Sequence, residues 1–116
     1  MTLQWRHLGG MLAAIPAAGL AGGAVFLVGD PLAAPTFMLA GMIAAFVHVG
    51  LFAMPLFALV LALDIRPTLP RVLFAALVIG MVPFSLITGF PAWWAGLAGL
   101  AGGLAFWVTA GPWETA

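Results

Sequence analysis

All six charged residues of this chain lie outside four long apolar segments, and this separation constrains the fold more than any other feature. A soluble domain carries roughly 25% charged residues because its surface must stay hydrated. Here only 5% of 116 residues are charged, so lipid must solvate most of the surface. The sequence therefore predicts an integral membrane protein with spans at about residues 8–28, 35–63, 72–88 and 91–109.

Each apolar segment is long enough to cross a bilayer as an α-helix, which takes about 20 residues within a range of roughly 17–25. None alternates apolar and polar residues with the period of two that a membrane β-barrel requires. The first segment exceeds the roughly 7–15 apolar residues of a signal-peptide core, so we expect a true span. We predict an all-α fold, a four-helix transmembrane bundle that forms one domain over residues 1–116.

The three basic residues indicate how the chain is threaded. Arg6 lies in the N-terminal tail, and Arg66 and Arg71 lie in the second loop, whereas the first and third loops carry no Lys or Arg. Because cytoplasmic loops are enriched in basic residues, we expect both termini in the cytoplasm and the arginines to act as topology anchors. An Ala- and Gly-rich, lysine-free composition is typical of a GC-rich bacterium, which suggests a multi-pass protein of the bacterial inner membrane.

Two G-x-x-x-G pairs, Gly19 with Gly23 and Gly99 with Gly103, mark faces where helices can approach closely. These pairs belong to stretches 18–28 and 98–108, which match at eight of eleven positions. Shared Ala/Gly composition and a true internal repeat both explain that match. We expect the glycine faces to be packing seams, either within the bundle or between protomers.

His48 lies near the middle of the second segment, at a depth where an unsatisfied polar group costs several kcal/mol. Pro55 lacks an N–H and so releases the carbonyl of Leu51 from the helical ladder. His48, Pro55 and Ser85 are the candidate intramembrane polar site. We expect a neutral His48 that faces the bundle interior and bonds to a backbone carbonyl or a hydroxyl of a neighbouring span.

Several kinds of chemistry lack the residues they need. The chain has no cysteine, its other histidine (His7) lies at a different depth, and no carboxylate lies within any span. In length and span number the chain is similar to the small multidrug transporters, but it lacks the membrane carboxylate used for proton-coupled antiport. No nucleophile–base pair or phosphate-binding glycine loop is present. We therefore expect no catalytic residues, no metal and no cofactor, and zero net charge argues against nucleic-acid binding.

These features predict a non-catalytic accessory, assembly or interaction subunit, surrounded by lipid, that associates with itself or with another membrane protein. The alternative is a small channel, carrier or holin-like pore in which His48 lines a polar path. Hydration of His48 separates the two hypotheses, because a pore must admit water to this residue whereas a packing subunit keeps it dry.

Overall fold

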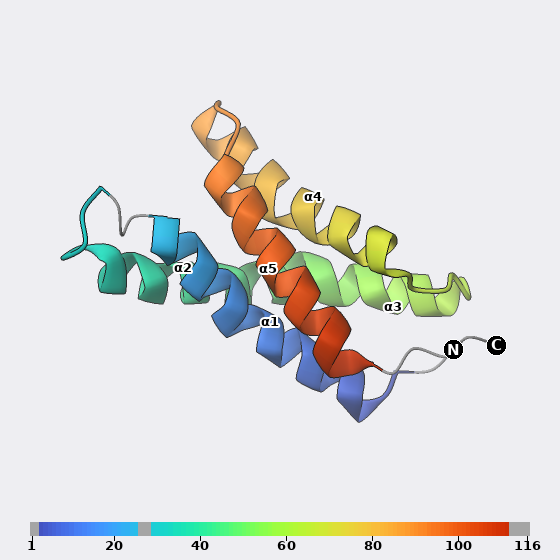
Figure 1. The fold of residues 1–116 in the computed structure, drawn as a ribbon. Helices are drawn as coiled ribbons and strands as arrows, with labels where there is room; N and C mark the ends of the chain where they lie inside the picture. The colour runs from blue at the N-terminus through green and yellow to red at the C-terminus, as the bar shows by residue number, and fades with distance from the viewer. Residues whose placement is uncertain (1–2, 26–28, 112–116) are drawn as a thin grey trace.

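The described part of the chain, residues 3–25 and 29–111 of a computed structural model, forms four long helices (Figure 1). All four are long and apolar enough to cross a membrane, which confirms the prediction of an all-helical chain with four such segments. The first is α1 (Trp5–Ala24), the third is α4 (Leu69–Thr88) and the fourth is α5 (Trp93–Ala110). The second is continuous over α2 (Ala34–His48), the π-helical turn η2 (Val49–Ala53) and α3 (Met54–Ala62).

Local chemistry explains where these helices begin and end. Helix α4 starts three residues earlier than predicted because the Thr68 hydroxyl accepts a hydrogen bond from the Arg71 N–H, with Pro70 in the first turn. It ends at Gly89, whose φ of 77° lies in the left-handed region that glycine adopts without strain. Helix α1 starts three residues earlier than predicted, and part of its predicted C-terminal end, residues 26–28, lies outside the described residues.

Pro55 changes the second helix one turn before its own position. The turn Val49–Ala53 is π-helical, and the N–H of Met54 bonds to the carbonyl of Val49, five residues back. The proline has no N–H to donate, so the ladder gains one residue in this turn and then continues into α3. Sequence reasoning placed the disturbance at the Leu51 carbonyl and did not predict a π-turn.

Helices α1 and α5 pack antiparallel along a seam of small residues. A Cβ atom added to Gly22 would lie 3.3 Å from Ala98 Cβ, and one added to Gly10 would lie 2.8 Å from Phe106 Cδ2. Small residues recur every four positions on the α1 side of this seam, and on the α5 side all but Phe106 are small, so the two backbones approach closely along its length. The α1 residues are Gly10, Ala14, Ala18 and Gly22, and the α5 residues are Ala98, Gly102, Phe106 and Ala110.

The glycine pairs singled out from the sequence form two further seams inside the chain. Gly19 and Gly23 lie against the backbone and side chains of Met42 and Met38 in α2, at separations that leave no room for a Cβ atom. Gly99 and Gly103 lie against α4, where Ala76 is their common neighbour. In this structure all four glycines therefore contact neighbouring helices of the same chain.

The three seams join the helices in the spatial order α4, α5, α1 and α2, and no fourth seam between described residues closes the ring. Seams of residues spaced four apart favour oblique crossings of about 40–50°. The α4–α5 pair consequently splays away from the long α2–α3 helix (Figure 1). An apolar core forms at the end where α1 begins and α5 ends, and its buried residues are Met11, Ala14, Phe57, Leu61, Phe106 and Ala110.

The seams predict a sharp contrast between two Gly→Ala substitutions. Gly99→Ala places a methyl group on the carbonyl oxygen of Ala76, whereas Gly9→Ala meets no atom within 4 Å. We expect Gly99→Ala to lower the free energy of unfolding by about 1–3 kcal/mol through overpacking. Gly9→Ala should raise it by up to about 1 kcal/mol through helix propensity. SDS titration in mixed micelles measures both, and equal effects would mean that α4 and α5 are not in close contact.

Candidate functional site: an apolar cleft beside His48

A cleft of about 220 Å³ lies between the long α2–α3 helix and α4, with α1 and α5 behind it. It exists because no seam joins α2–α3 to α4; within the described residues these helices meet mainly around His48. Small side chains such as Ala45, Ala53 and Ala75 recess its walls. Among the described residues that line it, the side chains with a polar or charged group are His48, Arg66, Arg71 and the indole of Trp94.

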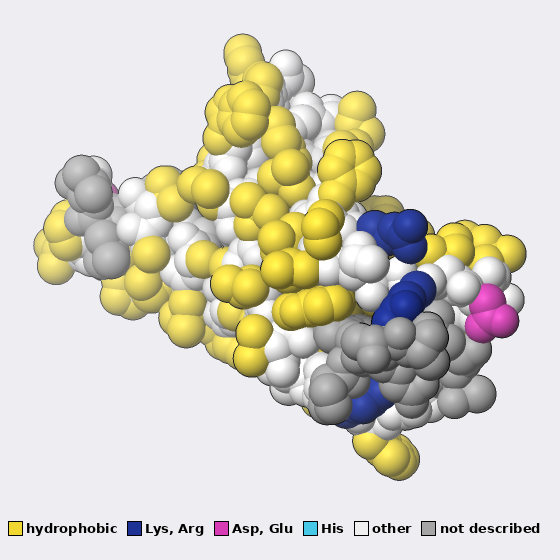
Figure 2. Space-filling view, turned by 45° about the vertical axis from the view of Figure 1, so that its right-hand side comes forward, with side chains coloured by type: hydrophobic (Ala, Val, Ile, Leu, Met, Phe, Trp, Pro, Cys, Tyr) yellow, Lys and Arg dark blue, Asp and Glu magenta, His cyan; other side chains and the backbone are white. Residues whose placement is uncertain are grey.

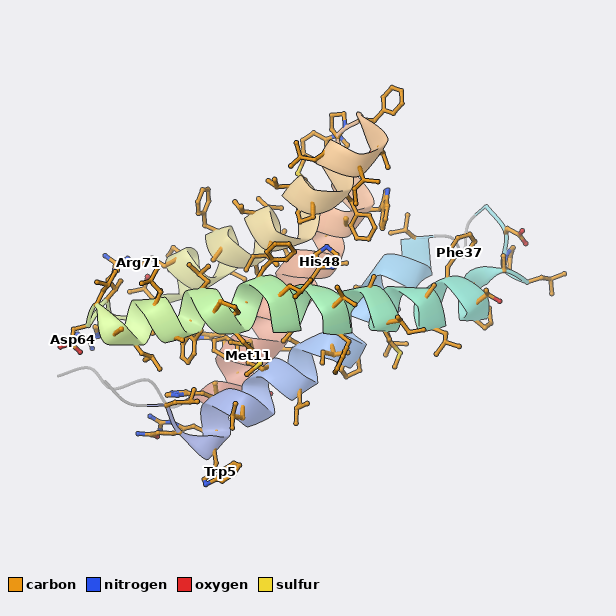
Figure 3. All side chains as sticks on the ribbon, turned by 180° about the vertical axis from the view of Figure 1, so that it is seen from behind. Trp5, Met11, Phe37, His48, Asp64 and Arg71 are labelled. Carbon is orange, nitrogen blue, oxygen red and sulfur yellow. The ribbon has the colours of Figure 1, made fainter. Side chains whose placement is uncertain are left out.

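His48 projects from the end of α2 toward α4. Its ring stacks on Phe84 with centroids 5.1 Å apart and planes at 15°, and it lies 5.8 Å from the ring of Phe52. Figure 3 shows His48 on the α4 side of the long helix and Met11 on the α1 side. The imidazole thus forms part of the boundary between the two splayed halves of the molecule.

The hydrogen bonding of His48 identifies its tautomer. Nδ1 lies 2.6 Å from the carbonyl oxygen of Ala44, and because a carbonyl can only accept, Nδ1 carries the proton. Nε2 is buried without a hydrogen-bond partner among the described residues. A charged ring would bury a second, unpaired N–H in this apolar setting, so the arrangement fits a neutral imidazole with an unused lone pair.

The partner of His48 differs from the one that we expected. Its hydrogen bond runs to Ala44 of its own helix, one turn back, and not to a neighbouring span. The neighbouring helix presents the ring of Phe84 at this level, which offers a flat apolar surface but no acceptor in the ring plane. Stacking therefore replaces the interhelical hydrogen bond predicted from the sequence.

The structure does not bring the other two candidate polar residues to His48. Pro55 is exposed, and its effect on the site is confined to the π-turn that follows His48. The hydroxyl oxygen of Ser85 accepts a hydrogen bond from the N–H of Ala92 at 3.0 Å, which stabilises the turn between α4 and α5. Neither side chain lines the cleft, so His48 is the member of the trio that does.

Two arginines stand at one end of the cleft. Arg71 donates from Nη1 to the carbonyl oxygen of Arg66 at 2.8 Å, which holds the loop before α4 against the start of that helix. Arg6 lies in the first turn of α1, which begins at this end of the molecule (Figure 1), and it does not line the cleft. Figure 2 shows that the basic side chains of that face gather at this end and that the described side chains elsewhere on it are mainly hydrophobic.

Sequence reasoning missed the aromatic residues of the site. Phe84 lies between His48 and Trp94, 5.1 Å from the first ring and 4.9 Å from the second, measured between centroids. In the sequence these two residues resemble ordinary apolar packing and a boundary tryptophan. The one signal in the sequence is the position of Phe84 along its span, which places it at a membrane depth where a residue of the second span can contact it.

No protein-family model, curated protein or solved structure matches the chain. Within residues 3–25 and 29–111, no three His, Cys, Asp or Glu side chains are grouped so as to hold a metal ion. The chemistry that the site does offer is one half-buried imidazole, whose Nε2 has no hydrogen-bond partner among the described residues, in an apolar cleft with two guanidinium groups at one end.

The site predicts that shape matters more than polarity at His48. His48→Phe preserves the stack on Phe84 and removes the unpaired Nε2, so the free energy of unfolding should change by less than about 1 kcal/mol. His48→Ala also removes the stack and should cost about 1–3 kcal/mol. SDS titration in mixed micelles measures both variants. A loss from His48→Phe as large as that from His48→Ala would mean that Nε2 has a polar partner.

Proposed function

We propose that this chain is a non-catalytic interaction subunit of the bacterial inner membrane, which acts by holding an apolar membrane component in the cleft between α2–α3 and α4. The single observation that carries the proposal is the nearly complete apolar lining of that cleft. Other copies of the chain or other membrane proteins would contact it through the outer faces of these helices, because the glycine pairs at Gly19/Gly23 and Gly99/Gly103 are used inside the bundle.

The alternative of a pore with His48 on a polar path has less support. Conduction of a hydrated solute needs polar groups or backbone carbonyls along the whole path. In the cleft the residues around His48 are aromatic or small and apolar, and Nε2 itself is covered. A hydrated path would leave this apolar wall in contact with water over most of its length.

The chain has no cysteine, so single cysteines can report whether water reaches the cleft. Ala75→Cys places a thiol in the cleft wall, Leu86→Cys places one on the exposed apolar face of α4, and Asp64→Cys places one in the loop. Reaction requires the thiolate, which forms only where water is present. We expect a charged methanethiosulfonate reagent to label Asp64→Cys rapidly and to label Ala75→Cys as slowly as Leu86→Cys in intact inside-out vesicles, whose cytoplasmic face is exposed to the reagent.

Labelling of Ala75→Cys at the rate of Asp64→Cys would contradict the proposal and favour the pore. Labelling after solubilisation in SDS is the control, because all three thiols should then react alike. A thiol that reacts slowly in the membrane but rapidly in SDS is therefore protected by its surroundings, and the slow reaction does not come from a damaged or oxidised thiol.

We propose further that both ends of the chain face the cytoplasm. The start of α1, the end of α5 and the α3–α4 loop lie at the same end of the molecule (Figure 1), and Arg6, Arg66 and Arg71 belong to that end. By the positive-inside rule this end is cytoplasmic. Fusions of green fluorescent protein to either terminus should fluoresce, and fusions of alkaline phosphatase should be inactive. Active phosphatase at either terminus would reverse the orientation.

A further inference from the structure

We propose that the component held in the cleft is a single anionic phospholipid, with its phosphate at Arg66 and Arg71 and one acyl chain lying along α4. This inference rests on the proposed function and names the ligand class of the same cleft. Two observations carry it: the charge at one end of the cleft and the length of its apolar wall.

The positive charge at one end of the cleft indicates an anionic headgroup. Arg66 and Arg71 both line the cleft at its loop end, and no carboxylate of the described residues lines it. A guanidinium has five N–H donors, of which the Arg71 side chain uses one on the Arg66 carbonyl. The Arg71 group therefore keeps donors for a phosphate oxygen, in the geometry that arginine uses for such groups.

The length of the apolar face of α4 matches the length of one acyl chain. The face of α4 that lines the cleft begins at Val72, directly after Arg71, and continues to Phe84. At a rise of 1.5 Å per residue these twelve steps span about 18 Å. The hydrocarbon core of a bilayer is about 30 Å thick, so one leaflet is about 15 Å deep. An acyl chain that starts at an arginine-bound headgroup thus ends near the level of Phe84.

Native mass spectrometry of the detergent-solubilised full chain tests the headgroup. The probes are dioleoyl phosphatidylglycerol and dioleoyl phosphatidylcholine, which differ in charge and share their acyl chains. We expect one phosphatidylglycerol to remain bound in preference to phosphatidylcholine. Each of Arg66→Gln and Arg71→Gln should lower that preference about fivefold, because one basic residue at an anionic surface contributes about that factor.

Two further variants make the result specific to the cleft. Arg6→Gln removes the same charge from the same end of the molecule without touching the cleft and should leave the preference unchanged. Arg71→Lys keeps the charge and should restore most of the preference that Arg71→Gln loses. An equal loss in Arg6→Gln would show that the lipid follows the general charge of this end, and would overturn the assignment.

Fluorescence of Trp94 tests where the acyl chain lies. The vesicles contain phosphatidylcholine with about a tenth of phosphatidylglycerol, and the Trp94 signal is the part of the emission that is lost in Trp94→Phe. Either lipid can carry bromine, a quencher, in the second half of its acyl chains. We expect brominated phosphatidylglycerol to quench the Trp94 signal more than brominated phosphatidylcholine does. Ala75→Phe fills the cleft and should abolish that difference. Circular dichroism confirms that each variant remains helical.

The failure of this inference differs from the failure of the proposed function. Equal binding and equal quenching by the two lipids would mean that the cleft takes any acyl chain, which overturns the anionic headgroup but leaves an apolar cleft. Absence of quenching by either lipid would overturn the lipid assignment altogether. Rapid labelling of Ala75→Cys by the charged thiol reagent is a separate result, and it alone would replace the apolar cleft by a hydrated path.

Discussion

Close contact between helix backbones at glycine and alanine is the constraint on which this structure depends. In lipid no hydrophobic force drives one helix onto another, so association relies on dispersion between closely approaching surfaces. Helix α5 carries two such faces, one toward α1 and one toward α4, and α1 carries a second face toward α2. Three seams fix a row of four helices, and their oblique crossings keep its two ends apart. The cleft follows from that geometry and needs no residue dedicated to forming it.

The sequence predicts the number of helices, their approximate ends and the close packing of Gly99 and Gly103, because apolar length and small-residue spacing are local properties. The order of the helices could not be predicted in this way. The α1–α5 seam uses Ala14, Ala18 and Gly102, which look like any other residues of an Ala/Gly-rich helix until a partner selects one face. The π-turn before Pro55 is also hidden, because a proline can be accommodated by a kink as well as by an inserted residue.

The site shows the same division. The depth of His48 and its position in the molecular interior follow from its place in the second segment, but its stacking on Phe84 depends on how α4 is placed relative to α2. The hydroxyl of Ser85 suggested a polar partner for His48, yet it bonds to the corner between α4 and α5. Arg66 and Arg71, which the sequence marks as topology anchors, also line the cleft because the loop folds back over its end. Residue type and depth were predictable, whereas the pairing of elements was not.

Disulfide trapping tests the open row of helices most directly, since the natural chain contains no cysteine. A Cβ atom at Gly22 would lie 3.3 Å from Ala98 Cβ, close to the 3.5–4.5 Å of a disulfide. Gly22→Cys with Ala98→Cys should cross-link rapidly when membranes are treated with a mild oxidant. Leu56→Cys with Ala75→Cys, on opposite walls of the cleft, should remain reduced. Equal cross-linking of both pairs would show that the bundle is closed and would contradict the account.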